Sequence, residues 1–153
     1  MKKVRLWEIS IWFNESSNKY NKLLIQSQIS SLVNNARIIG RFETDKMCRL
    51  NVNIYPISDR NLFPDIDTKK METTYRIGHD NINSMLAFID LEEVLTINDQ
   101  TKRLHFLSLW IQSVLKRYFD YNKIDSSNLI NGFKQVQENN FYTYASKKYL
   151  NRN

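Results

Sequence analysis

Histidine, cysteine and glycine are scarce in this sequence, and their scarcity removes the commonest catalytic arrangements. The 153 residues include two histidines, one cysteine and three glycines. Zinc and non-haem iron sites draw their ligands chiefly from clustered Cys and His, but His79, His105 and Cys48 are far apart along the chain. The single cysteine excludes an internal disulfide. We therefore expect no catalytic site, no metal and no cofactor.

Isolated glycines also exclude a loop that cradles phosphate with its backbone. Such loops need clustered glycines so that N–H groups can approach the anion closely, whereas Gly40, Gly78 and Gly132 each stand alone. His79 is followed by Asp80 in a predicted turn, a pair that could act as a base and its orienting group. No nucleophile accompanies the pair, so no catalytic role is assigned to it.

Long hydrophobic runs are missing as well. The longest apolar stretch, Leu104 to Leu115, contains His105 and three other polar residues, so it is too short and too polar to cross a bilayer. The basic start of the chain is not followed by an uninterrupted apolar segment or a cleavage site, unlike a signal peptide. A soluble, cytoplasmic protein without membrane contact is expected.

What the sequence does contain is typical of one globular domain spanning residues 1–153. Hydrophobic residues make up 42% of the chain and aromatic residues 12%, enough to bury a substantial core. The net charge of +6 is unevenly distributed. The window from Asp59 to Asp99 has nine acids and four bases, while the rest of the chain has seven acids and 18 bases. This pattern predicts an acidic region on a basic protein.

Periodicity predicts strands early in the chain and helices late. Strands are expected at 3–13, 37–43, 48–55 and 71–77, and residues 48–55 alternate most regularly. Helices are expected from Ser16 or Ser17 to Ala36, from Asp90, from Asp99 or Thr101 to Tyr118, and from about Asp125 through Val136. Residues 85–90 fit a strand or a buried helix, and the tail from Phe141 is compatible with a last strand. Segregated strands and helices favour an α+β fold, with an antiparallel or mixed sheet and helices packed on one face.

Two surfaces are candidates for binding. The loop from Pro56 to Lys70 presents two apolar residues among acids, which is typical of an interface hot spot with a charged surround. The alternative is a loop that folds down, with Phe63 in the core. The expected partner-binding residues are Asp59, Leu62, Phe63, Asp65, Asp67, Glu72, Glu92 and Glu93.

The second candidate surface interleaves bases with aromatic rings, as surfaces that bind single-stranded nucleic acid do. It is the alternative interpretation of the chain, a nucleic-acid-binding module with a basic, tyrosine-rich C-terminal surface. Bases at the end of a helix are also favoured by its dipole alone. The residues of this alternative are Lys116, Arg117, Tyr142, Tyr144, Lys147 and Lys148.

The small size, the early strands and late helices, and the run from Phe88 to Leu95 leading into the helix of Trp110 together suggest a family. The chain resembles bacterial immunity proteins of polymorphic and contact-dependent growth inhibition toxin systems. The resemblance implies tight, stoichiometric blockade of one cognate protein toxin, often a nuclease, by charge and shape complementarity. Many inhibitors of nucleases are acidic overall, whereas this chain is basic. Either the acidic window therefore forms the contact or the toxin is itself acidic.

Overall fold

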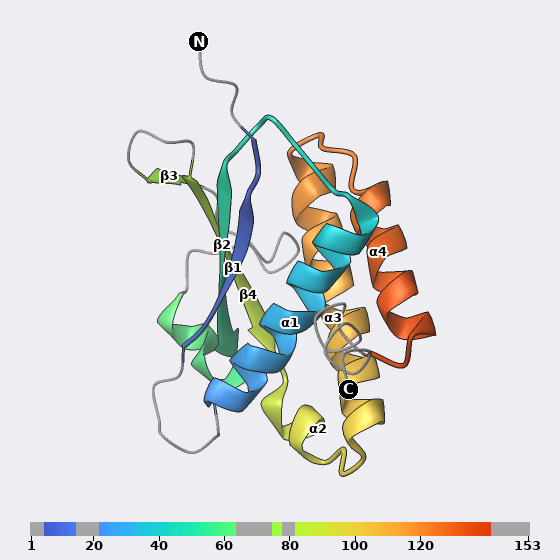
Figure 1. Cartoon of the computed structure of the whole chain (residues 1–153). Coiled ribbons are helices and arrows are strands. Elements are labelled where there is room, and N and C mark those ends of the chain that lie inside the picture. The colour runs from blue at the N-terminus through green and yellow to red at the C-terminus, as the bar shows by residue number, and fades with distance from the viewer. Residues whose placement is uncertain (1–4, 15–21, 64–74, 78–81, 142–153) are drawn as a thin grey trace.

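A single sheet covered on one face by helices forms the framework of the chain (Figure 1). The computed structural model describes residues 5–14, 22–63, 75–77 and 82–141. The sheet contains β1 (Glu8–Phe13), β2 (Arg49–Pro56), β3 (Tyr75–Ile77) and β4 (Ile82–Ile89) in the order β1-β2-β4-β3. The helices are α1 (Lys22–Gly40), α2 (Leu91–Leu95), α3 (Gln100–Tyr121) and α4 (Ser127–Glu138), with a short 3₁₀ helix, η1 (Ile57–Leu62), after β2.

The three long strands are all parallel, so the prediction of an antiparallel or mixed sheet is wrong for the body of the sheet. β1 pairs with β2 from Glu8 opposite Arg49, and β2 pairs with β4 from Arg49 opposite Ile82. Antiparallel pairing is confined to the three residues of β3 at one edge. The error arose at residues 37–43, which were expected to form a strand next to 48–55. Residues 37–40 instead complete α1, which makes β1-α1-β2 a crossover unit, and a crossover connects parallel strands.

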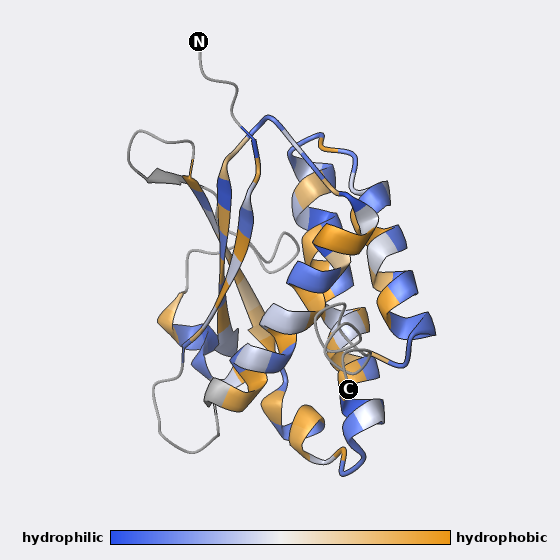
Figure 2. Ribbon diagram, in the orientation of Figure 1, coloured by the Kyte–Doolittle hydropathy of each residue, from blue (hydrophilic) through white to orange (hydrophobic). Residues whose placement is uncertain are grey.

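The predicted alternation of residues 48–55 is confirmed in β2. Leu50, Val52 and Ile54 are fully buried toward the helices, and the residues between them are half-buried on the other face. Residues opposite them in β1 and β4 also join the core; these are Ile9, Ile11, Phe13, Met85 and Ala87. Ile89, which is opposite Pro56, joins the core as well. Figure 2 shows hydrophobic segments along the strands and on the helices that cover them.

Three of the helix starts follow the predicted capping residues. The Asp90 carboxylate accepts a hydrogen bond from the backbone N of Glu93 at 3.1 Å, and Asp99 accepts one from Lys102 N at 2.9 Å. Such bonds satisfy amide groups that the first turn of a helix leaves without partners. Before α4, Asp125 accepts from Ser127 N at 2.9 Å, and this backbone hydrogen bond is the main reason that the pKa of Asp125 is lowered.

The closest helix contact joins α1 to α4 and depends on two glycines. A Cβ atom on Gly132 would lie 1.9 Å from the carbonyl oxygen of Ala36, and one on Gly40 would lie 2.1 Å from the carbonyl oxygen of Asn128. Both distances are far shorter than any van der Waals contact, so the two backbones can touch only because these side chains are absent. Two of the three glycines therefore serve helix packing and not turns.

Replacement of Gly132 by alanine is expected to lower the free energy of unfolding by about 3 kcal/mol, because the helices must separate to make room for the methyl group. Alanine is otherwise the better helix former, so the loss isolates the steric effect. Urea denaturation measures it, with Asn131→Ala as the matched control. Asn131 is exposed on the same turn of α4, and its replacement should change stability by less than about 0.5 kcal/mol. Equal stability of the two variants would contradict the proposed contact.

Candidate partner-binding surface

The carboxyl end of the sheet brings together two segments that lie about thirty residues apart in the sequence. In the parallel pairing of β2 with β4, Pro56 is opposite Ile89. η1 begins directly after β2, and α2 begins two residues after β4. The expected partner-binding residues of 57–63 and of 90–95 therefore lie at the same end of the molecule (Figure 1).

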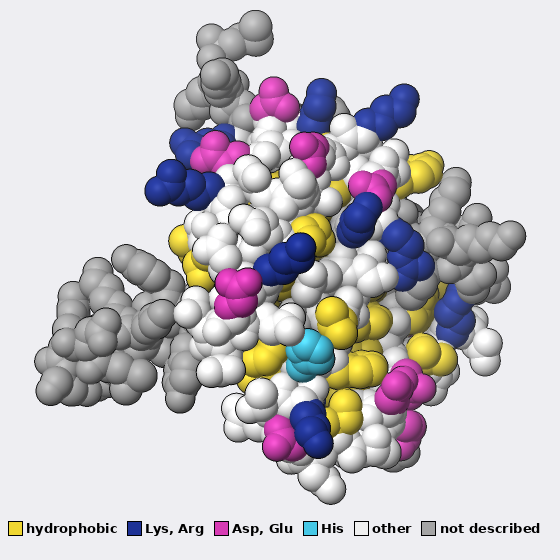
Figure 3. All heavy atoms as spheres, turned by 90° about the vertical axis from the view of Figure 1, so that its right-hand side faces the viewer, with side chains coloured by type: hydrophobic (Ala, Val, Ile, Leu, Met, Phe, Trp, Pro, Cys, Tyr) yellow, Lys and Arg dark blue, Asp and Glu magenta, His cyan; other side chains and the backbone are white. Residues whose placement is uncertain are grey.

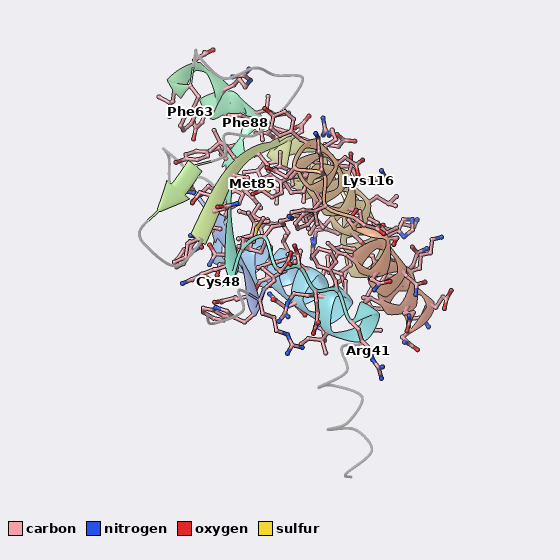
Figure 4. All side chains as sticks on the ribbon, turned by 90° about the horizontal axis from the view of Figure 1, so that it is seen from above. Arg41, Cys48, Phe63, Met85, Phe88 and Lys116 are labelled. Carbon is pink, nitrogen blue, oxygen red and sulfur yellow. The ribbon has the colours of Figure 1, made fainter. Side chains whose placement is uncertain are left out.

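An aromatic cluster anchors η1 to the face of the sheet opposite the helices. The ring centroid of Phe63 lies 4.7 Å from that of Tyr55 and 5.8 Å from that of Phe88. The guanidinium carbon of Arg60 lies 5.1 Å from the centroid of Phe88, and Arg60 donates a hydrogen bond to the carbonyl oxygen of Phe63 at 3.1 Å. In Figure 4, Phe63 and Phe88 lie together, across the sheet from Lys116 of α3. Phe63 is thus half-buried and belongs to the fold.

The other expected partner-binding residues differ in their exposure to solvent. Leu62 is 61% exposed on η1, and Glu92 and Glu93 are exposed on α2. Asp59, in contrast, is only 8% exposed, so its burial does not fit the expected surface contact. The burial of Asp59 in η1 could not be predicted, because the sequence of this segment has no clear periodicity. Asp65, Asp67 and Glu72 lie outside the described residues.

Two further carboxylates extend the acidic surface around α2. Asp90 and Asp99 are exposed, one before α2 and one before α3. Both also cap their helices, so each side chain is held by a backbone hydrogen bond. We call the exposed set of Leu62, Asp90, Glu92, Glu93 and Asp99 the carboxyl-end surface. All five residues lie within the acidic window from Asp59 to Asp99, and this window was the feature of the sequence that indicated the surface.

The alternative surface is divided by the geometry of α3. Lys116 and Arg117 are exposed, but Tyr118 and Phe119, the next two residues, are fully buried. Lys116 Nζ lies 2.6 Å from the Asp120 carboxylate one turn away, which offsets its charge. These two rings are therefore on a different face of the helix from the bases, whereas Tyr121, one turn after Arg117, is 54% exposed. Tyr142, Tyr144, Lys147 and Lys148 lie outside the described residues.

Side chains of α1 occupy the free edge of β1. The backbone N of Phe13 donates to Gln26 Oε1 at 2.7 Å, and Asn34 Nδ2 donates to the carbonyl oxygen of Ile9 at 3.2 Å. An exposed strand edge is a template for pairing with another chain, and these two bonds occupy part of that template. A partner is therefore expected to bind through side chains and not by adding a strand here.

A basic pocket at the opposite end of the sheet was missed by sequence reasoning. Arg5 precedes β1, while Arg37 and Arg41 lie at the end of α1, and all three line one pocket of about 580 Å³ together with Trp7. Figure 3 shows Lys and Arg side chains gathering toward this upper end of the molecule, with acids among them. The spacing of Arg37 and Arg41 was the available signal, but residues 37–43 were interpreted as a strand.

Within the described part of the chain, no three His, Cys, Asp or Glu side chains come close enough together to hold a metal ion. His105 of α3 is half-buried, with its ring 6.2 Å from that of Phe141, and His79 lies outside the described residues. None of the described helices has the length and apolarity needed to cross a membrane. Comparison of the chain with protein-family models, curated proteins and solved structures finds no match.

Truncation of Phe63 is expected to lower the stability of the fold, whereas truncation of Leu62 is expected to leave it nearly unchanged. Phe63→Ala removes two ring contacts and should lower the free energy of unfolding by about 1–2 kcal/mol. Leu62→Ala removes an exposed side chain and should change it by less than about 0.5 kcal/mol. Thermal and urea denaturation of both variants test this, and a destabilising Leu62→Ala would mean that Leu62 supports the fold.

Proposed function

We propose that the chain is a non-catalytic, protein-binding module of the cytoplasm, and specifically an immunity protein that neutralises a cognate toxin by stoichiometric binding. The observation that carries the proposal is the carboxyl-end surface. There an exposed apolar side chain, Leu62, lies at the same end of the sheet as the four exposed carboxylates around α2.

The arrangement supports protein binding because its parts have separate physical roles. An exposed leucine can be desolvated by a partner and so slow dissociation. The carboxylates of Glu92 and Glu93 attract a basic partner over a distance of about 10 Å, which accelerates association more than it strengthens the final complex.

Rigidity of the surface adds to this support. The contacts of Phe63 and Arg60 with Phe88 fasten η1 to β4, and the capping bonds of Asp90 and Asp99 fix the ends of α2 and α3. A surface that is ordered before binding loses less conformational entropy on association. Nucleic-acid binding through Lys116 and Arg117 has less support, because Lys116 is paired and the adjacent rings are buried.

The first experiment is to tag the protein in its native host, purify it with nuclease present, and identify any protein that co-elutes at equal stoichiometry. A secreted-toxin fragment whose toxicity is neutralised by co-expression of this chain would support the proposal. Recovery of RNA or DNA without nuclease, and of no protein with it, would overturn the proposal in favour of nucleic-acid binding.

With that partner in hand, the double variant Glu92→Lys/Glu93→Lys should slow association about tenfold at low salt. The difference should fade at 1 M salt, where the screening length falls to about 3 Å. Leu62→Ala should instead accelerate dissociation, because it removes apolar contact and no charge. Stopped-flow or surface-plasmon kinetics separate the two rates.

The matched control is Asp45→Lys, which reverses an exposed charge at the opposite end of the molecule. It should leave both rates close to those of the wild type. Unchanged rates in the Glu92→Lys/Glu93→Lys and Leu62→Ala variants would count against the carboxyl-end surface, even if the partner itself were a toxin.

A further inference from the structure

The pocket at the amino end of the sheet concentrates positive charge from two separate elements. Its lining includes Arg5, Trp7, Arg37, Ile38, Arg41 and Glu43. Three guanidinium groups face one carboxylate, and that carboxylate, Glu43, is already ion-paired with Arg5. Arg37 and Arg41 are the other two cations that line the pocket.

Arg37 is the least satisfied of these cations. Its Nε atom is buried and has no hydrogen-bond partner in the described structure. Burial lowers the pKa of its guanidinium, and the carboxylate of Glu8 partly offsets this effect. Glu8 itself lies 3.5 Å from Nε of Arg49. A buried donor without a partner costs free energy, and the arginine that carries it lines the pocket.

Arg41 is held in the pocket by an unfavourable backbone conformation. It follows the last residue of α1 with φ at +53°, in the left-handed region that glycine favours. Hydrogen bonds from Arg41 N to Ile38 O at 3.2 Å and from Phe42 N to Arg37 O at 3.0 Å close the helix around it. Gly40, one residue earlier, is required for contact with α4. An arginine thus occupies a position where glycine is favoured, as Lys123 does after α3 and Asn140 does after α4. The conformation ends the helix, and in α1 it places an arginine at the pocket.

The dipole of α1 explains part of this arrangement but not all of it. Cations near the carboxyl end of a helix are favoured, which accounts for Arg37 and Arg41. It does not account for the buried Nε atom, nor for Arg5, which comes from the segment before β1. Trp7 is also 57% exposed at the pocket, with the Arg49 guanidinium 5.7 Å from its centroid. An exposed tryptophan beside three arginines offers a ring surface next to the charges.

We propose that this pocket binds the phosphate group of a phosphorylated ligand through Arg37 and Arg41, with the ring of Trp7 available to the remainder of the ligand. Guanidinium groups match phosphate oxygens with paired, charge-assisted hydrogen bonds. The phosphate can come from inorganic phosphate or from a nucleotide, and both present the same group to the arginines. The site is separate from the carboxyl-end surface and does not rest on its role.

Titration of the full chain with inorganic phosphate, AMP, adenosine and acetate, followed by calorimetry and tryptophan fluorescence, tests the site. Phosphate and AMP should bind, whereas adenosine and acetate should not. AMP binding more tightly than phosphate, with the gain lost in Trp7→Ala, identifies a nucleotide as the source. Equal binding of the two identifies phosphate alone, and both results support the site. Binding of neither, or equal binding of acetate, would overturn it.

Two variants locate the binding. Arg37→Gln should weaken phosphate binding about tenfold, because a charged hydrogen-bonding group is removed. Arg41→Gly should weaken it similarly while raising the melting temperature, since glycine relieves the left-handed conformation. This opposite response separates loss of binding from loss of folding. Lys102→Gln, an exposed cation at the other end of the sheet, is the control, and unchanged affinity in both arginine variants would refute the assignment.

Discussion

The contact between the backbones of α1 and α4 is the constraint on which the rest of the helical layer depends. Gly132 lies against the carbonyl of Ala36, and Gly40 lies against that of Asn128. With α4 held this close to α1, Tyr118 and Phe119 of α3 are fully buried, and Phe42 meets Phe119 edge to face at 5.0 Å. The same contact fixes the end of α1. It therefore also determines where Arg37 and Arg41 lie, because Arg37 is one turn before Gly40 and Arg41 is the residue after it.

Parallel pairing of the long strands gives the molecule two chemically different ends. All carboxyl ends of β1, β2 and β4 lie together, and the segments that leave β2 and β4 there carry Leu62 and the acids around α2. The opposite end collects Arg5 and the arginines at the end of α1. The acids around α2 and the arginines of the pocket thus lie at different ends of the sheet, with Glu43 and Asp45 also at the end of the arginines. An antiparallel sheet would have alternated the strand ends and mixed the two groups of charges.

The candidate site was predictable only in part. The acidic window indicated Glu92 and Glu93, and the capping roles of Asp90 and Asp99 followed from local residue preferences. Phe63 was expected either as an exposed anchor or as a core residue, and its contacts with Tyr55 and Phe88 place it near the second alternative. That outcome depends on β4, 25 residues later in the chain. The burial of Asp59 and the pocket of Arg37 depend on similar long-range packing.

The sequence by itself determined the local features of this protein. Alternation specified β2, and helical periodicity with capping carboxylates specified α3, because these signals depend on neighbouring residues. Only the tertiary structure decided strand direction and the fate of residues 37–40. Ile38 and Ile39 favour a strand locally, but close packing of Gly40 on α4 and of Ile39 on the core extends the helix. Such packing energies arise between residues nearly a hundred positions apart, where no local pattern records them.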